Sequence, residues 1–448
     1  MKNNKIKKMH KQAFSVSQNL HSTKPDFKIK EILKEQLAII KPSKIELAEI
    51  GKRTKEVIDA INVNIKKQKL SASVFVGGSS AKGTLIKKDK YDIDLFVRFD
   101  KKYDDKEISK LLGKIIPKNS MRVHGSRDYF SLKQKDSNAA FEIIPVLNIK
   151  KPSEAKNITD LSYFHVNYIK NKISKNKRLA DDIMLAKAIL HFSDCYGAES
   201  YINGFSGYAV ELLIVAFGSF AKFIEAIAKT DVKKEKIILD PAKLYKNKTQ
   251  ILQEMNESKL KSPIILIDPT FKERNALAAL STDTFLRFQE VCKKFLASPS
   301  NKFFIAKDKE ALFEQKHKNK TINLVISTDK QGGDIAGTKL KKFYGFFLRE
   351  ADRYLDISAF DFVYDEDSNK GKIMLVAVPK KQIVFSGPPI TMKEPLAKFK
   401  KEHRNIKIIK GKAFAYEKSV SFDKFLSDFM NSMSKFIEEM DVTGIEVA

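Results

Sequence analysis

The chain has 448 residues, of which 43% are hydrophobic and 31% charged. This composition is typical of a folded protein of several domains and excludes a disordered chain. Lysine and arginine number 83 against 55 acidic residues, a net charge of +28. Such an excess indicates a polyanionic partner such as nucleic acid, although a lysine-rich proteome would produce it too. Cys195 and Cys292 lie far apart, so neither a disulfide framework nor a structural zinc site is expected.

The N-terminal residues 1–26 are polar and basic and are interpreted as a flexible arm. They lack the apolar run of a signal peptide. The most hydrophobic stretch, residues 208–228, contains charged residues, including Glu211, and is therefore predicted to be a buried helix and not a membrane span. The expected location is the cytoplasm, with no membrane partner.

Three domains are expected after the arm. Residues 27–70 have helical periodicity interrupted at Pro42, and the short strands that follow them predict an α/β domain over 27–152. Residues 153–300 are predicted to form a helical central domain, and residues 301–448 a mixed α/β domain. The strands are expected at 74–76, 92–99, 140–146, 321–327, 358–364 and 372–378; the clearest helices at 178–192 and 283–296; and a sharp turn at 387–389.

A glycine- and serine-rich segment, 77–84, follows the first strand and is predicted to open a helix. Its glycines permit a tight turn whose N–H groups can converge on an anion, and Ser79 and Lys82 can donate hydrogen bonds to a phosphate. Taken alone, such a turn is more often a plain strand-to-helix connection.

Two carboxylates on the next strand favour the phosphate interpretation. Asp92 and Asp94 stand at i and i+2, so both point to the same face of the strand. Like charges beside a hydrophobic core are costly unless a cation lies between them, and Mg²⁺ prefers carboxylate oxygens. The alternative is that both are solvated at a sheet edge. The turn shortly before them favours the metal.

A Gly-Ser turn followed by Asp-x-Asp resembles the nucleotidyltransferase superfamily of DNA polymerase β. The resemblance implies a third carboxylate on a neighbouring strand, for which Glu142, within the apolar run 141–145, is the candidate. A surface-facing Glu on an edge strand is the alternative. The implied mechanism uses Mg²⁺ ions bound by Asp92, Asp94 and Glu142 to transfer a nucleotide.

Further runs are similar to the archaeal-type (class I) CCA-adding enzymes. They are the segments 160–165, 185–187 with 196–199, 204–213, 268–275 and 386–392, and the resemblance spans roughly residues 30–400. It implies nucleotide contacts from Ser162 and His165, triphosphate contacts from Lys187 and Tyr196, and base recognition by Arg274. Considered without the family, Lys187 reads as a solvated helix residue and Arg274 as part of a surface ion pair.

The sequence departs from the family pattern at two positions. Glu142 stands where the family usually has Asp, and Lys82 where it often has Arg. The longer Glu side chain can alter the geometry of a bound metal, and Lys cannot make the bidentate phosphate contact of Arg.

The expected fold class is therefore α+β and multidomain, with a polymerase β-like head, a helical central domain, and a mixed α/β C-terminal body and tail. The resemblance implies template-independent addition of C, C and A to the tRNA 3′ end from CTP and ATP. The expected partner is the acceptor stem and T arm of tRNA, held by lysines of the C-terminal third; a homodimer is left open. The alternatives are a poly(A)- or oligoadenylate-type transferase and an inactive RNA-binding protein on the same scaffold.

Overall fold

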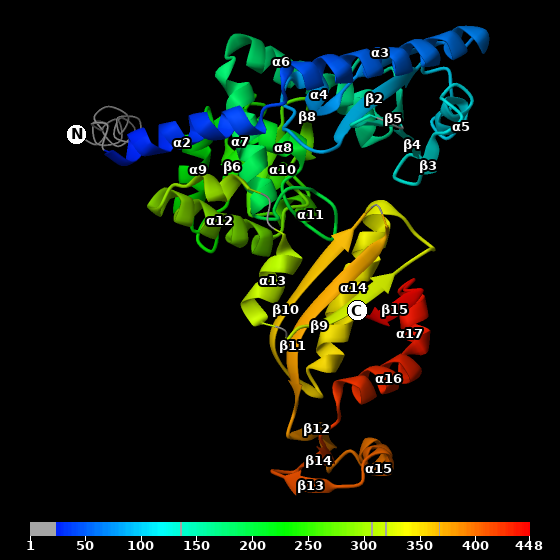
Figure 1. Cartoon of the computed structure of the whole chain (residues 1–448), viewed down its shortest axis with the longest axis vertical. Helices are drawn as coiled ribbons and strands as arrows, with labels where there is room; N and C mark the ends of the chain where they lie inside the picture. The colour runs from blue at the N-terminus through cyan, green and yellow to red at the C-terminus, as the bar shows by residue number, and fades with distance from the viewer. Residues whose placement is uncertain (1–23, 135–136, 306–307, 319, 367) are drawn as a thin grey trace. The chain divides into compact units, whose positions relative to one another are not determined.

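The computed structural model describes residues 24–134, 137–305, 308–318, 320–366 and 368–448 (Figure 1). The predicted arm lies outside these residues except for its last three, which belong to helix α2 (Lys24–Ile40). The chain divides into two compact units, residues 1–198 with 204–306, and residues 199–203 with 307–448. Among the described residues, every helix is too short or too polar to cross a membrane.

A five-stranded sheet in the order β1-β2-β5-β4-β3 forms the first part of the larger unit. Its strands are β1 (Ala72–Val76), β2 (Tyr91–Phe99), β3 (Met121–Val123), β4 (Tyr129–Lys133) and β5 (Ala139–Leu147). β2 and β5 pair in parallel, and the other neighbouring strands are antiparallel. The strands predicted at 74–76, 92–99 and 140–146 are confirmed, whereas the short strands β3 and β4 were not predicted.

Helices cover one face of this sheet. α3 (Lys44–Lys67) begins at Ser43, whose side chain accepts a hydrogen bond from the Glu46 backbone while Glu46 accepts one from the Ser43 backbone. This capping box starts the helix directly after the interruption at Pro42. α3 and α5 (Ile108–Gly113) share a hydrophobic core with alternate residues of β2 and β5. The remaining residues of β2, Asp92 and Asp94 among them, therefore lie on the opposite face.

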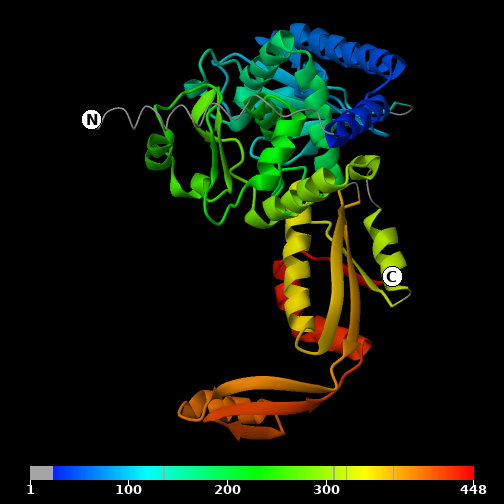
Figure 2. The same ribbon diagram turned by 90° about the vertical axis from the view of Figure 1, so that its left-hand side faces the viewer.

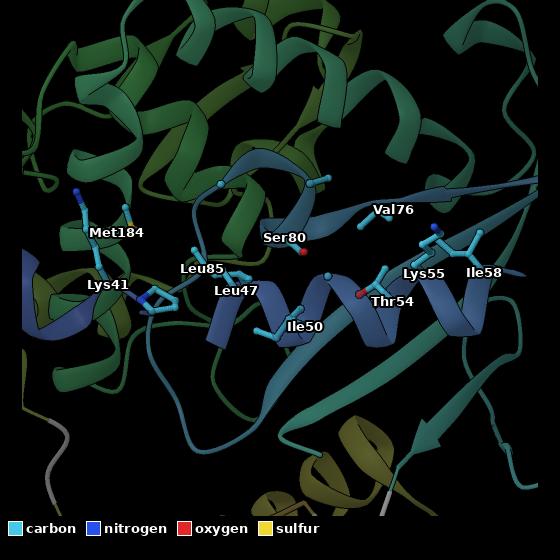
Figure 3. Close-up of a pocket in the computed structure, with 14 residues that line it drawn as sticks. Lys41, Leu47, Ile50, Thr54, Lys55, Ile58, Val76, Ser80, Leu85 and Met184 are labelled. Atoms are coloured by element: carbon cyan, nitrogen blue, oxygen red, sulfur yellow. The ribbon is translucent and has the colours of Figure 1, made fainter. Parts of the chain in front are cut away.

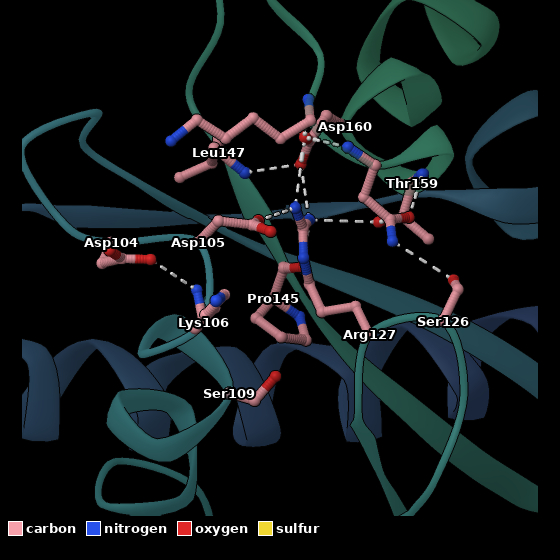
Figure 4. Close-up of polar contacts among 12 residues, drawn as sticks. Asp104, Asp105, Lys106, Ser109, Ser126, Arg127, Pro145, Leu147, Thr159 and Asp160 are labelled. Carbon is pink, nitrogen blue, oxygen red and sulfur yellow. Dashed lines mark hydrogen bonds and ion pairs between the residues drawn. The ribbon is translucent and has the colours of Figure 1, made fainter.

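A network of buried ion pairs and hydrogen bonds lies at the C-terminal end of β5 (Figure 4). The Arg127 guanidinium donates to Asp160 at 2.5 Å, to the Pro145 carbonyl at 3.1 Å, and to Asp105. Asp160 also accepts a hydrogen bond from the Leu147 backbone at 2.8 Å. Arg127 is 8% exposed and Asp160 2% exposed, so both charges are removed from water and depend on each other. The network holds the chain that leads from β5 into the central helices.

Arg127→Met should destabilise the folded protein by about 3–5 kcal/mol, because it leaves the Asp160 carboxylate buried without its cation. The urea concentration at the unfolding midpoint of the full chain measures this. Arg122→Met in the same hairpin is the control, since Arg122 pairs with Asp128 at the surface and should contribute less than about 1 kcal/mol. Equal midpoints for the two variants would contradict the buried network.

The central part of the larger unit is mainly helical. Its helices are α6 (Ser162–Lys175), α7 (Arg178–Phe192), α8 (Gly207–Phe217), α9 (Phe220–Lys229), α10 (Lys248–Glu254), α11 (Glu257–Leu260) and α12 (Thr282–Ala297), with the 3-10 turns η1 (Pro152–Glu154), η2 (Ile158–Leu161) and η3 (Asn301–Phe304). A small sheet of β6 (Ile237–Leu239), β7 (Ile264–Asp268) and β8 (Phe271–Asn275) accompanies them. α7 and α8 belong to one large hydrophobic core with α2, α9 and α12. The helices predicted at 178–192 and 283–296 are confirmed.

The single buried helix predicted over 208–228 is wrong. Gly218 ends α8 in the left-handed conformation, with φ of 83°, and Ser219 caps the start of α9 by accepting a hydrogen bond from the Lys222 backbone. A glycine stop followed at once by a serine cap separates two helices even where hydrophobicity is continuous.

The smaller unit contains two sheets. Its elements are α13 (Lys309–His317), β9 (Ile322–Ser327), α14 (Gly333–Ala351), β10 (Leu355–Asp365), β11 (Lys370–Pro379), β12 (Gln382–Pro389), α15 (Lys393–Glu402), β13 (Ile406–Ile409), β14 (Lys412–Lys418), α16 (Phe422–Ser432), α17 (Ser434–Glu439) and β15 (Gly444–Val447). α14 packs along the sheet β10-β11-β9-β15 (Figures 1 and 2), and the second sheet has the order β12-β14-β13. The predicted strands at 321–327, 358–364 and 372–378 are confirmed.

The sharp turn predicted at 387–389 is wrong, because these residues form the end of β12. The strand is irregular there, since its register against β14 shifts between Ser386 and Pro389. A Cβ atom on Gly387 would lie 2.6 Å from the Phe399 ring. Gly387 therefore allows α15 to approach β12 closely, and the chain does not reverse there.

Candidate active site

The three predicted catalytic carboxylates share one face of the five-stranded sheet. Asp92 and Asp94 lie on β2, and Asp94 stands directly opposite Glu142 in the parallel register of β2 with β5. Both strands are interior, β2 between β1 and β5 and β5 between β2 and β4. Neither strand is therefore the edge strand that the two alternatives assumed, although Asp92 itself is exposed. Paired positions on parallel strands point to the same side, so all three side chains start from the same face.

The environment of Asp94 disfavours two negative charges side by side. Burial and, to a smaller extent, the charge of Asp92 raise the pKa of Asp94 to about 6, against the opposing effect of the Lys82 charge. Asp92 itself is largely exposed and lies 3.7 Å from the Lys88 ammonium. A cation placed on this face would relieve the repulsion and favour the ionised form of Asp94.

The turn after β1 is built against the same carboxylate. Helix α4 (Gly78–Lys82) follows β1, as the sequence predicts, and Gly77 donates its backbone N–H to the Asp94 carbonyl at 2.8 Å. Gly78 has φ of +56°, and a Cβ atom there would lie 1.6 Å from the Asp94 carboxylate. Only glycine fits this close approach. Ser79, the next residue, consequently lies in the first turn beside the acidic face.

Both lysines expected at the triphosphate meet at one buried acid. The Glu211 carboxylate accepts a hydrogen bond from Lys82 at 2.6 Å and another from Lys187 at 3.1 Å. Lys187 is 3% exposed, so its interpretation as a solvated helix residue is wrong. Sequence reasoning did not assign Glu211 to the site. An acid within an apolar run was the available signal, because a buried Glu requires a partner.

A second buried acid gathers the residues expected near the base. Asp268 is fully buried and contacts His165 at 3.0 Å, Arg274 at 2.8 Å and the Tyr208 hydroxyl at 3.0 Å. His165 stacks on Tyr208 with ring centroids 4.0 Å apart. Arg274 thus belongs to a partly buried cluster and not to a surface ion pair. The sequence placed Asp268 only within a family run and missed it as the centre of this cluster.

The charges of this cluster are fixed by their surroundings. Burial opposes ionisation of Asp268, but the His165 hydrogen bond and the Arg274 charge outweigh it and hold the pKa of Asp268 well below its usual range. Burial lowers the pKa of His165. At neutral pH, His165 is therefore uncharged, and when it donates from Nε2 to the Asp268 carboxylate its Nδ1 is left as an acceptor.

Tyr196 and Ser162 complete the predicted set. Tyr196 follows α7 and stacks on His191 with ring centroids 4.1 Å apart. A Cβ atom on Gly207 would lie 2.6 Å from the Tyr196 hydroxyl. Gly207, the first residue of α8, therefore leaves room for the Tyr196 side chain. Ser162 is the first residue of α6, one turn before His165.

The donors suit a hard divalent cation. Carboxylate oxygens are the ligands that such ions prefer, and burial together with the charge of Asp92 raises the pKa of Asp94 although Lys82 and Lys187 oppose the shift. In the part of the chain that the structure describes, no three His, Cys, Asp or Glu side chains are gathered closely enough to hold a metal by themselves. Asp92, Asp94 and Glu142 start from the same face of the sheet but do not form such a group in this structure.

An apolar cavity of about 620 Å³ lies between α3 and α4 (Figure 3). Leu47, Ile50 and Ile58 of α3 form one wall, and Val76 and Ser80 lie across from them. None of the ten predicted site residues lines this cavity. It is therefore separate from the acidic face and from both buried clusters.

Comparison with known proteins agrees with this geometry. The model of the nucleotidyltransferase domain matches residues 57–160, and the model of the second domain of tRNA nucleotidyltransferase matches residues 181–305. The CCA-adding enzyme of Nanoarchaeum equitans is 31% identical over 78% of this chain and 85% of its own length. That of Methanocaldococcus jannaschii is 30% identical over 87% of each chain, and that of Methanosarcina mazei 29% identical over 86% of this chain and 84% of its own.

The sheet, the turn at Gly78 and the paired acids of β2 define a nucleotidyltransferase of the polymerase β-like class, whose members generally use divalent metal ions. Within that class, the chain belongs to the family of CCA-adding enzymes. The resemblance and the fold class predicted from the sequence are confirmed, and the comparisons favour this family over the poly(A)-type and inactive alternatives.

Proposed function

We propose that this enzyme adds C, C and A to the 3′ end of tRNA from CTP and ATP without a template, releasing pyrophosphate. One observation carries the assignment of the catalytic centre: Asp92, Asp94 and Glu142 share a face of the sheet, and the helix that bears Ser79 and Lys82 is packed against Asp94. Carboxylates beside a phosphate-binding turn are the arrangement that phosphoryl transfer requires.

Asp92, Asp94 and Glu142 are the residues proposed to hold the metal, and we assign it as Mg²⁺ because all three donors are carboxylates. When bound, Mg²⁺ makes the RNA 3′-hydroxyl more acidic and offsets the charge that develops on pyrophosphate. The backbone and side chains of the enzyme make the other contacts with the triphosphate. The α4 backbone and Ser79 donate hydrogen bonds to the triphosphate, and Lys82, Lys187 and the Tyr196 hydroxyl orient it.

The cluster at Asp268 is proposed to read the base. Cytosine and adenine both carry an amino donor next to a ring-nitrogen acceptor, whereas uracil and guanine carry a carbonyl next to an N–H. Arg274 supplies donors, and the neutral His165 supplies an acceptor at Nδ1. An acceptor facing the amino group and a donor facing the ring nitrogen complement cytosine and adenine, whereas in uracil and guanine the same pair would meet a carbonyl and an N–H that cannot bond to them. Ser162 is assigned to the same pocket by its place at the start of α6.

The lysines around α15 are proposed to bind the tRNA. Lys393, Lys398, Lys400, Lys401 and Lys410 are all exposed, on α15 and on the turn between β13 and β14. An A-form stem presents phosphates and a wide minor groove, which proteins recognise by shape and charge and not by sequence. The acceptor stem and T arm of tRNA form such a stem next to the 3′ end, and they are the proposed acceptor.

Binding of tRNA should weaken steeply with salt, because each neutralised phosphate releases counterions. With six or more phosphate contacts, affinity should fall on the order of 10³-fold between about 50 and 200 mM salt. Replacing Lys398, Lys400 and Lys401 with alanine should reduce the slope of log affinity against log salt. Filter binding at several salt concentrations measures both effects.

The matched control removes three exposed lysines at the end of α3, Lys66, Lys67 and Lys69, and should leave the slope nearly unchanged. A minihelix made of the acceptor stem and T arm should be extended nearly as well as whole tRNA. Affinity that does not depend on salt, or a requirement for the anticodon arm, would refute the proposed tRNA surface while leaving the catalytic assignment intact.

A further inference from the structure

Helix α8 carries a buried acid, Glu211, that contacts two lysines. Glu211 is 1% exposed and stands among the buried residues Val210, Leu212 and Leu213. Its Oε2 accepts a hydrogen bond from the Lys82 ammonium at 2.6 Å, and its Oε1 accepts from Lys187 and from the Thr84 hydroxyl, both at 3.1 Å. A single carboxylate therefore connects α4 with α7 through two lysines.

The hydrogen bonds of the two lysines differ. Lys187 donates to Glu211, to the Thr84 hydroxyl at 3.1 Å and to the Thr84 carbonyl at 3.3 Å, so its three donors all have partners. Among the residues that the structure describes, Lys82 donates a hydrogen bond to Glu211 alone, which leaves two of its three donors for a ligand. In this arrangement Lys82 can bind a phosphate directly, whereas Lys187 acts through its charge.

Glu211, Lys82 and Lys187 together carry a net charge of +1. Burial lowers the pKa of Lys187, and the charge of Glu211 opposes that shift, while the charge of Lys82 adds to it. Without the carboxylate, two ammonium groups would face each other in a site that excludes water, and such a pair is unfavourable. The acid is thus what allows both cations to stay in place.

We propose that Glu211 is a positioning residue for nucleotide addition, which holds Lys82 and Lys187 in the geometry and charge state that bind the triphosphate. This inference rests on the proposed function of the two lysines. Stability alone does not call for the acid, because a buried ion pair is often replaced by apolar residues without loss of stability. A carboxylate at this position is explained if two lysines must stay charged and in place before an anionic ligand binds.

The test is steady-state kinetics of the full chain with tRNA that ends in CC and with ATP as the variable substrate. Glu211→Gln should raise the KM for ATP by about tenfold or more while changing kcat by less than about threefold. The lysines hold the triphosphate about equally in the bound substrate and in the transition state, and losing such an interaction raises KM and leaves kcat nearly unchanged. The KM for tRNA should not change. Glu225→Gln, an exposed acid of the neighbouring α9, is the control and should match the wild type.

A double substitution separates positioning from a general loss of structure. Lys187→Met alone should raise the KM for ATP, and adding Glu211→Gln to it should raise that KM by much less than in the wild-type background, because Glu211 acts partly through Lys187. Glu211→Asp keeps the charge and should restore part of the affinity. If Glu211→Gln cannot be purified, Glu211→Asp carries the test: an increase in its KM for ATP that adds fully to the increase caused by Lys187→Met would refute the inference.

The outcomes distinguish this inference from the proposed function. If Lys187→Met leaves the KM for ATP unchanged, the proposed triphosphate role of Lys187 is wrong. If Lys187→Met raises it and Glu211→Gln does not, the lysine assignment stands and the positioning role of Glu211 is refuted. Equal loss of ATP and tRNA affinity in Glu211→Gln would also refute it, because that is the result of a purely structural change.

Discussion

Asp94→Asn should lower the rate of nucleotide addition at least about 10³-fold, equivalent to about 4 kcal/mol of transition-state stabilisation. Asparagine has the same shape, so the contact with Gly78 is kept, but a neutral amide is a poor ligand for a hard cation. Binding of tRNA should be nearly unchanged. Single-turnover rates with labelled CTP, and filter binding of tRNA, measure the two effects.

The control for this variant is Asp59→Asn, which removes an exposed carboxylate from α3 and should have no effect. Glu142 provides a companion test on the neighbouring strand. Glu142→Gln should lose most of the rate, and Glu142→Asp should keep partial or full activity, because the carboxylate remains. Normal turnover by Asp94→Asn would refute the metal assignment, and normal turnover by Glu142→Gln would move the third carboxylate elsewhere.

Arg274→Ala should reduce the preference for CTP and ATP over UTP and GTP by about tenfold or more, since a hydrogen-bonded reading of the base is worth about 1–3 kcal/mol. The basal rate should suffer less than the selectivity, because the carboxylates of β2 and β5 are untouched. The kcat/KM values for all four nucleotides with one acceptor give the answer.

Lys272→Ala is the matched control, because Lys272 lies on the same strand as Arg274 and its ammonium contacts Glu254 at 3.9 Å and the face of Tyr245 at 5.7 Å, away from Asp268. It should leave selectivity as it is. If Arg274→Ala and Lys272→Ala show the same nucleotide preferences as the wild type, the base is read by other groups, and the cluster at Asp268 is structural.

Local patterns in the sequence predicted the parts of the site that lie close together along the chain. The spacing of Asp92 and Asp94 placed both on one face, and the glycines before them predicted the turn that the structure shows at Gly78. The strands expected at 92–99 and 140–146 correspond to β2 and β5, and the amphipathic run 178–192 corresponds to α7. These features depend on neighbours within a few residues, which is the range over which a single sequence carries information.

Partners that come together only by folding were not predicted. Glu211 meets Lys82 across 129 positions, and His165 meets Asp268 across 103. Nothing in the local sequence shows that one acid will serve two lysines, or that Arg127 will be buried against Asp160. The two errors in secondary structure, at 208–228 and 387–389, have different origins. Over 208–228, continuous hydrophobicity outweighed the local helix stop at Gly218 and the cap at Ser219. At 387–389, a glycine that accommodates the distant Phe399 ring was interpreted as a turn.

Both acidic clusters follow one physical scheme. A buried carboxylate holds Lys82 and Lys187 at Glu211, and another holds His165 and Arg274 at Asp268; the proposed function places all four side chains on the nucleotide. Holding these groups before the substrate arrives reduces the cost of ordering them during binding. Under the proposed function, donors and acceptors fixed in this way would let an enzyme without a template select its nucleotides.

The most direct test of the central claim is to incubate the full chain and Mg²⁺ with tRNA that lacks its 3′ CCA, using labelled CTP, labelled ATP, or both. CTP alone should give addition of two cytidines, and both nucleotides together should give CCA and then stop. ATP alone should be used efficiently only on tRNA that already ends in CC. Continued addition of adenosine, addition of only one of the two nucleotides on every acceptor, or no incorporation at all would contradict the assignment of this chain as a CCA-adding enzyme.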